Sequence, residues 1–210
     1  MSMSDSKTTT DEEAVVADPA LDHLSRREIG REGVWSLSSA KPGNGVEQLR
    51  DDNKETYWQS DGAQPHLINI QFHKKMSILE VALYLDNTLD ESYTPKKVSV
   101  RAGSSYHDLV EITVKELNEP MGWVLIPMSA HTSSRTGLGR VDPGESGPGS
   151  SILRAHFLQI CVATMHQNGR DTHIRQVLLL FCSTWCSKNL PRAVKRAYYC
   201  IMSWNHLLLF

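Results

Sequence analysis

The sequence has 210 residues, a length that allows one domain with terminal extensions or two small domains. Its 22 Lys and Arg residues nearly balance 24 Asp and Glu, so a formal charge of -2 gives no general attraction to nucleic acid or anionic membranes. Hydrophobic residues make up 40% of the chain, enough for a core, but no apolar run approaches the roughly 20 residues that span a bilayer. The chain has four cysteines, Cys161, Cys182, Cys186 and Cys200. They provide no disulfide framework and indicate reduced thiols in an intracellular protein.

Residues 1–27 are polar and acidic, and we expect a disordered leader there. The composition changes at Glu28, where the folded body is predicted to begin. A turn signal follows at residues 41–45, and residues 46–49 can form a single helical turn. Tyr57 and Trp58 point to opposite faces if they lie in a strand, and we expect Trp58 to enter the core.

Short apolar patterns, several of period two, predict strands further along the chain. They cover residues 68–72, 77–85, 98–101, 123–128, 158–163 and 173–181. Turn residues separate these segments, and no stretch of ten residues between them shows helical periodicity. Six or seven short strands favour an antiparallel β-sandwich, because two amphipathic sheets bury their apolar faces against each other.

Two stretches depart from this pattern. Residues 132–151 are rich in Gly, Ser and Pro, so we expect a flexible insertion between two strands. Residues 183–210 form a basic, apolar tail with no acidic residue, and residues 191–204 can accommodate a helix. The sequence therefore predicts one folded body, interrupted once, between two dissimilar ends.

The densest polar stretch covers residues 166–173 and lies between two predicted strands. One interpretation is a solvent-exposed hairpin loop, because the Asn168-Gly169 pair is typical of tight turns. The other is a ligand loop, because Arg170, Asp171 and Thr172 add both charges, donors and acceptors that a plain hairpin does not require. Such side chains suit a peptide or a sugar.

Catalytic and metal sites find little support in the sequence. His166, Asp171 and His173 lack the fixed spacing on one element that zinc ligands usually have. No Gly-x-Ser-x-Gly motif marks a nucleophile, and the adjacent acids at residues 51–52 and 90–91 suit solvated or capping roles better than glycosidase carboxylates. We therefore expect no enzymatic activity, no cofactor and no metal.

Three polar stretches, residues 51–62, 90–95 and 166–173, resemble in their order the Doc domain of the anaphase-promoting complex, a ubiquitin ligase. The similarity covers about residues 26–181 and is carried by residues 27–30, 34–39, 41–43, 48–53, 55–62, 64–67, 69–72, 90–95, 122–123 and 166–173. The resemblance implies an all-β fold, a jelly-roll β-sandwich of the galactose-binding-domain type, over residues 28–182.

The resemblance also implies a non-catalytic role, in the nucleus and cytoplasm, as a substrate-recognition and processivity subunit that promotes ubiquitination of cell-cycle regulators. Its implied partners are the core subunits of the complex, a WD40 co-activator and substrates with a destruction box. With the co-activator, such a subunit forms a receptor for this degron, an extended Arg-x-x-Leu motif. The degron-binding residues that it implies are Ser60, Asp61, Ser92, Asn168, Gly169, Arg170, Asp171, Thr172 and His173.

Two features depart from the family pattern. Family members have a short link where this chain has residues 132–151, and they end in an Ile-Arg dipeptide that docks in a tetratricopeptide-repeat subunit, whereas this chain ends in residues 207–210, Leu-Leu-Leu-Phe. The alternative function is a carbohydrate- or small-ligand-binding β-sandwich, because such folds bind glycans with loops at the same end. The acidic N-terminal stretch, unlike a signal peptide, disfavours that alternative.

Overall fold

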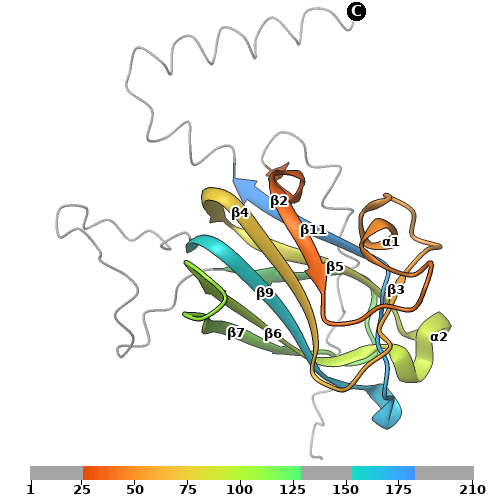
Figure 1. The fold of residues 1–210 in the computed structure, drawn as a ribbon. Helices are drawn as coiled ribbons and strands as arrows, with labels where there is room; N and C mark the ends of the chain where they lie inside the picture. The colour runs from red at the N-terminus through yellow and green to blue at the C-terminus, as the bar shows by residue number, and fades with distance from the viewer. Residues whose placement is uncertain (1–25, 129–152, 183–210) are drawn as a thin grey trace, which may run out of the picture.

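The computed structural model describes residues 26–128 and 153–182. Two antiparallel sheets face each other in a sandwich, as Figure 1 shows. The four-stranded sheet has the order β1 (Arg26–Glu28), β11 (Gln176–Cys182), β5 (Glu80–Asp86) and β8 (Met121–Pro127). The five-stranded sheet has the order β2 (Gly33–Leu37), β4 (His66–Ile78), β9 (Leu153–Met165), β6 (Pro95–Gly103) and β7 (Val110–Glu116). A separate pair joins β3 (Trp58–Gln59) to β10 (His173–Ile174).

Helices are short throughout the described residues. The α-helices are α1 (Val46–Arg50) and α2 (Asn87–Asp90), and the 3-10 turns are η2 (Gly30–Glu32), η3 (Glu91–Tyr93) and η4 (His166–Asn168). The single helical turn expected at residues 46–49 is confirmed, and within residues 26–128 and 153–182 no long helix lies between the predicted strands. Among the described residues, no helix is long and apolar enough to cross a membrane.

The core lies between the two sheets and is built from the apolar face of each strand. Ile70 of β4 and Ile160 of β9 come from the five-stranded sheet, and Leu83 of β5 and Leu179 of β11 come from the other; all four are fully buried. Trp58 is fully buried too, which confirms its expected core position, and its indole Nε1 donates to the carbonyl of Ser39 at 2.9 Å. The all-β sandwich predicted from strand spacing is therefore confirmed.

The strand predicted over residues 77–85 is wrong as one element, because the chain changes sheets within it. β4 ends at Ile78 in the five-stranded sheet, and β5 begins at Glu80 in the other. Leu79 lies between them, and its N–H donates to the carbonyl of Leu180 at 2.8 Å. The strand predicted over residues 173–181 is likewise divided, at Arg175, into β10 and β11. Strand β7 was not predicted.

The ends of the described body lie together. Arg26 of β1 pairs with Cys182 of β11, so strand structure is already present two residues before the predicted start at Glu28. The remainder of the predicted leader, the insertion at residues 132–151 and the tail at residues 183–210 fall outside the described residues. At the opposite end of β11, near Gln176, the segments that carry α2 and η4 come together (Figure 1).

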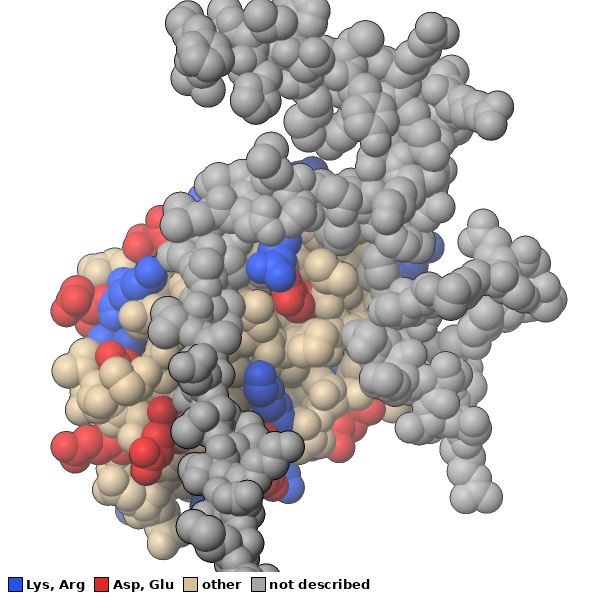
Figure 2. Space-filling model, turned by 180° about the vertical axis from the view of Figure 1, so that it is seen from behind, with Lys and Arg blue, Asp and Glu red and all other residues tan. Residues whose placement is uncertain are grey.

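The charged side chains are mixed in sign. Figure 2 shows Lys and Arg interspersed with Asp and Glu among uncharged residues on the described part of the rear face. No large surface of one sign appears in that view, in agreement with the near-neutral net charge of the chain.

Candidate functional site

Three segments that are distant in sequence meet at one end of the sandwich, and we call them the loop cluster. They are residues 60–66, which follow β3 and reach the start of β4, residues 86–94 with α2 and η3, and residues 166–173 with η4. The amide of Gln64 donates to the carbonyl of Gly169 at 3.0 Å, and the N–H of His166 donates to the carbonyl of Thr94 at 2.9 Å. His66, which is fully buried, contacts the carbonyl of Arg170 through Nε2 at 2.7 Å. These bonds make one continuous surface of three loops.

Gly169 is required by the close approach of two backbones. A Cβ built on Gly169 would lie 1.8 Å from the carbonyl oxygen of Ser92, so no other residue fits without a shift of one loop. The left-handed conformation expected of the Asn168-Gly169 pair falls on Gln167 and Asn168, with φ of 50° and 56°. Asn tolerates this region better than most residues. The turn therefore uses its glycine for contact with the neighbouring loop.

Ser60 and Thr172 join two of the loops below the surface. The N–H of Ser60 donates to the carbonyl of Thr172 at 3.2 Å, and the N–H of Thr172 donates to Oγ of Ser60 at 2.9 Å. The hydroxyl of Thr172 also donates to the carbonyl of Tyr93, at 3.3 Å, which brings in the third loop. Both residues are fully buried, so these bonds form away from water and fix the loops relative to one another.

A buried ion-pair network supports the loop cluster from beneath. Asp90 accepts two hydrogen bonds from Arg175, from Nε to Oδ2 and from Nη2 to Oδ1, both at 2.9 Å. Nδ1 of His173 lies 3.0 Å from Oδ1 of the same carboxylate. The imidazole of His173 is stacked between the rings of Tyr57 and Tyr93, with centroid distances of 4.2 Å on both sides. The side chain of His173 is therefore held on its edge and on both faces.

Electrostatics keep this network charged. Burial raises the pKa of the Asp90 carboxyl, but the hydrogen bonds from His173 and Arg175 and the positive charge of Arg175 outweigh burial and hold that pKa below its ordinary value. Burial lowers the pKa of Arg175, and the carboxylate of Asp90 more than compensates and raises it. Arg175 is also anchored to the carbonyl of Lys54 through Nη1 at 2.9 Å. The Asp90 carboxylate and the Arg175 guanidinium are thus both ionised at neutral pH.

The nine residues that the sequence assigned to degron binding all lie in the loop cluster, with different exposure. Asp61, Asn168 and Arg170 are exposed, Ser92, Gly169 and Asp171 are half-buried, and Ser60, Thr172 and His173 are buried. A ligand that arrives from solvent can reach the first six. The three buried residues hold the loops in place.

Comparison with known proteins gives the family. The family model described as "Anaphase-promoting complex, subunit 10" matches residues 2–191, most of the sequence. The chain belongs to this family. Among curated members, subunit 10 of the mouse complex is 51% identical over 151 residues, which are 72% of this chain and 72% of that protein. The Dictyostelium discoideum subunit 10 is 48% identical over 162 residues, 76% of this chain and 77% of that one. The resemblance to this family drawn from the polar motifs is thereby confirmed.

Solved structures confirm the jelly-roll type of this sandwich. A family 32 carbohydrate-binding module from Clostridium perfringens NanJ, in complex with galactose, has a TM-score of 0.56 at 12% identity. That similarity covers 74% of this chain and 99% of the module. The two-module structure from Clostridium perfringens ZmpB, in complex with GalNAc, has a TM-score of 0.59 at 9% identity over 78% of this chain and 38% of that one. At such low identity the similarity shows the fold.

The residues that support the loop cluster from beneath were not predicted from the sequence. Asp90 was expected to be solvated or to cap a turn; this was wrong, because its side chain is buried and ion-paired. Asp51 fits the expectation, since it is exposed and its Oδ1 accepts from the N–H of Asn53 at 2.9 Å. Arg175 carried a usable signal, because a charge within the apolar run 173–181 must find a buried partner.

Metal chemistry was weighed for His166, Asp171 and His173. Within residues 26–128 and 153–182, no group of three His, Cys, Asp or Glu side chains is placed to hold a metal ion. The Nδ1 atom of His173 is engaged with Asp90, and its ring lies between two tyrosines. The loop cluster presents a preformed surface that can form hydrogen bonds and ion pairs.

Proposed function

We propose that this chain is a non-catalytic subunit of the anaphase-promoting complex and that its loop cluster contacts the destruction-box degron together with a WD40 co-activator. Membership of the subunit 10 family supports assembly with the core of the complex. The observation that carries the degron assignment is the rigid placement of exposed polar side chains over a buried hydrogen-bond and ion-pair network. The chain contributes binding, and ubiquitin transfer takes place on other subunits.

The exposed and half-buried side chains of the loop cluster suit an extended peptide. Asn168 offers a donor and an acceptor, Arg170 and Asp171 offer opposite charges, and Ser92 offers a hydroxyl. Short polar groups of this kind bind peptide backbone and tolerate variation in sequence. A second weak contact on a substrate already held by a co-activator slows its escape, so more ubiquitins are added in one encounter.

The exposed residues of the loop cluster provide the test. The variant Asn168→Ala/Arg170→Ala/Asp171→Ala leaves the buried network intact, and we expect it to co-purify with the complex but to give shorter ubiquitin chains on a destruction-box substrate. The matched control is Ser104→Ala/His107→Ala, which changes exposed residues of the β6–β7 loop at the opposite end of β6. We expect normal chains from the control. Equal chain lengths for both variants would remove the assignment.

The carbohydrate-binding alternative makes a different prediction. If the loops bound a glycan, the purified chain would give a dose-dependent signal on a glycan array, and the triple variant would abolish it. We expect no such signal and expect recovery of the core subunits from extracts that contain the tagged chain. We also propose a nuclear and cytoplasmic location, which imaging of a fluorescent fusion tests.

A further inference from the structure

The four-stranded sheet is apolar on its outer face as well as on the face that lines the core. On β5, Val81 and Leu83 belong to the main core, so by strand alternation Ala82 and Tyr84 point to the opposite face. A second cluster of apolar side chains lies there, and we call it the outer cluster: Leu178 and Leu180 on β11, Ala82 and Tyr84 on β5, and Trp123 and Leu125 on β8. Within residues 26–128 and 153–182, no strand or helix forms a third layer over it.

The outer cluster is shielded from water. Ala82 and Leu180 are 0% and 1% exposed, and Trp123 is 9% exposed. Part of this shielding comes from charged side chains, because Nε of Arg26 on β1 lies 2.7 Å from the Glu80 carboxylate on β5, and this bridge passes over β11 between them. A contiguous apolar patch on an outer face is typical of a surface that another segment covers.

Trp123 adds a polar requirement to this face. Its indole Nε1 is buried and has no hydrogen-bond partner among the described residues, whereas buried indole N–H groups usually have an acceptor. The ammonium of Lys54 lies 5.1 Å from the ring centroid of Tyr84 and 5.9 Å from that of Trp123. A segment that covers the outer cluster should therefore bring hydrogen-bond acceptors and negative charge next to aliphatic side chains.

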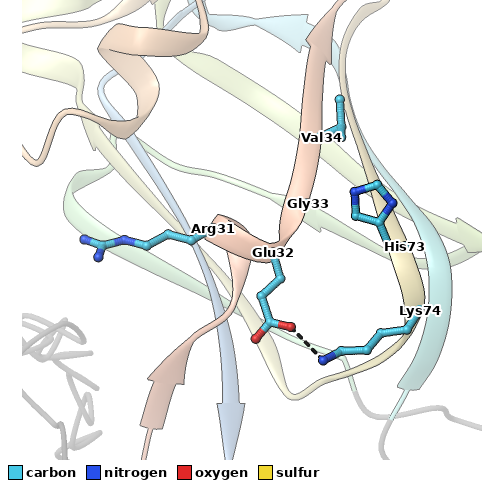
Figure 3. Close-up of a pocket in the computed structure, with 6 residues that line it drawn as sticks. All are labelled: Arg31, Glu32, Gly33, Val34, His73 and Lys74. Carbon is cyan, nitrogen blue, oxygen red and sulfur yellow. Dashed lines mark ion pairs between the residues drawn. The ribbon is translucent and has the colours of Figure 1, made fainter.

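The hollow beside β2 and β4, shown in Figure 3, has no such requirement. It is lined by Arg31, Glu32, Gly33, Val34, His73 and Lys74. The Glu32 carboxylate is paired there with Lys74 at 3.0 Å and with Arg27 at 3.1 Å. None of the described side-chain atoms that are buried without a partner belongs to this lining. The outer cluster is thus the better candidate for a covered surface.

The N-terminal stretch of the chain has the chemistry that the outer cluster requires. Residues 11–13 are Asp-Glu-Glu, and residues 14–17, which follow directly, are Ala-Val-Val-Ala. Three carboxylates thus adjoin four small aliphatic side chains. The two other stretches outside the described residues do not match: residues 129–152 contain no aliphatic run, and residues 183–210 contain four basic residues and no acidic one.

This stretch is also tethered at the correct place. It leads into Arg26, which begins β1 at the edge of the same sheet and pairs with Cys182. Trp123 lies about 20 Å further along the strands, the length from Cys182 to Gln176, and about 15 Å across them, from β1 to β8. The chain between residues 13 and 26 can extend up to about 40 Å, which is more than this diagonal.

We propose that residues 11–17 lie across the outer cluster and cover the four-stranded sheet. The acidic residues 11–13 face Lys54 and the indole N–H of Trp123, and residues 14–17 pack on Ala82 and the leucines of β11. Composition predicts a disordered N-terminal stretch, and the proposal makes an exception for these seven residues. It concerns the free chain and does not rest on the proposed function.

NMR spectroscopy of the full-length chain tests the apolar contact. We expect nuclear Overhauser effects from the methyl groups of Val15 and Val16 to the indole ring of Trp123 or to the leucine methyl groups of the outer cluster. We also expect the indole N–H of Trp123 to exchange at least about tenfold faster in the variant Val15→Asp/Val16→Asp. The matched control, Thr8→Asp/Thr9→Asp, adds the same charge outside residues 11–17 and should leave this exchange unchanged.

Three results would overturn the proposal. The first is the absence of contacts from Val15 and Val16 to the outer cluster, and the second is equal exchange in the two aspartate variants. The third is a set of contacts to the outer cluster from residues 129–152 or 183–210 in place of residues 11–17. The backbone amide spectrum of each variant shows whether the sandwich itself remains folded.

A charge exchange tests the ionic contact. Lys54→Glu should release residues 11–17 and speed exchange of the Trp123 indole N–H, and adding Glu12→Lys/Glu13→Lys to the same chain should restore slow exchange. Lys97→Glu, at an exposed position on β6 of the other sheet, is the control and should change nothing. An unchanged rate in Lys54→Glu, or no recovery in the combined variant, would contradict the placement of the acidic residues at Lys54.

Discussion

At Gly169 two loops touch through their backbones, and a single methyl group would force them apart. A Cβ there would overlap the carbonyl of Ser92 at 1.8 Å. We expect Gly169→Ala to lower the free energy of unfolding by about 1–3 kcal/mol, as overpacking usually does, and to weaken the proposed degron contact. Urea denaturation measures the first effect.

The comparison for that change is Gly62→Ala in the same loop cluster. Its Cβ would meet only the side chain of Ser39, at 3.0–3.1 Å, which can move. We expect a cost below about 1 kcal/mol. If both alanines cost the same, the contact between Gly169 and Ser92 would not be the reason that the loop requires glycine.

Asp90 gives the chain a pH dependence in acid. Its pKa in the folded chain lies below the ordinary value of 3.8, so the stabilisation is fully present above that value and is lost as pH falls through the folded pKa. Asp90→Asn removes this dependence and leaves Arg175 buried without its partner, at a cost of about 3–5 kcal/mol at neutral pH. Unfolding free energies measured from pH 6 to pH 2 should fall less steeply for the variant. Equal slopes would contradict the assignment.

The residue scale also shows what sequence could predict about the candidate site. All nine expected residues gather at one end of the sandwich, because the motifs that carry the family resemblance are the loops that meet there. Their division into exposed and buried residues could not be predicted, since Thr172 is buried by Ser60, which lies 112 positions away in the chain. The contact between Asp90 and Arg175, which lie 85 positions apart in the chain, could not be predicted for the same reason.

At the element scale, α2 positions one wall of the loop cluster and depends on its N-cap. The carboxylate of Asp86 accepts from the N–H groups of Thr88 and Leu89 at 3.0 and 3.2 Å. We expect Asp86→Ala to lower the free energy of unfolding by about 1 kcal/mol and to speed amide exchange over residues 87–93. Thermal denaturation and hydrogen exchange check these two effects.

Asp108 provides the control for that helix cap. Its carboxylate accepts from the N–H groups of Ser104 and Ser105 in the β6–β7 loop, far along β6 from the loop cluster. Asp108→Ala should cost a similar free energy but leave exchange at residues 87–93 and the length of ubiquitin chains unchanged. An equal effect of both variants on ubiquitin chains would mean that general stability, rather than the wall formed by α2, controls the proposed degron contact.

Element boundaries show where period-two patterns stop being informative. The run 77–85 is apolar except for Ser77 and Glu80 and does not alternate, so its pattern does not reveal that Leu79 is the point where the chain leaves one sheet for the other. Strand β7 was available in principle, because Val110, Ile112 and Val114 alternate with polar residues. The predicted fold class is correct despite these errors, because it depends on the number and spacing of strands more than on their ends.

At the scale of the whole molecule, Arg50 connects the two sheets at their edges. Its guanidinium donates to the Glu28 carboxylate on β1 at 3.1 and 3.2 Å, donates to the Val177 carbonyl on β11 at 3.0 Å, and lies 4.5 Å over the ring of Trp35 on β2. A planar group with several donors makes all of these contacts, and an ammonium group cannot. We expect both Arg50→Lys and Arg50→Ala to lower the free energy of unfolding by about 1–3 kcal/mol. Full rescue by lysine in urea denaturation would contradict this geometry.

The pairing of Arg26 with Cys182 determines how the chain can be labelled. Both ends of the described body leave the sandwich at the same edge, a strand length away from Gln176 and the loops beside it. A fluorophore attached near either end therefore reports on the same corner of the molecule and leaves the loop cluster unobstructed. That corner is one fixed reference point, whichever end of the described body carries the fluorophore. Energy transfer from it to a dye on a bound degron peptide would therefore give the orientation of the peptide.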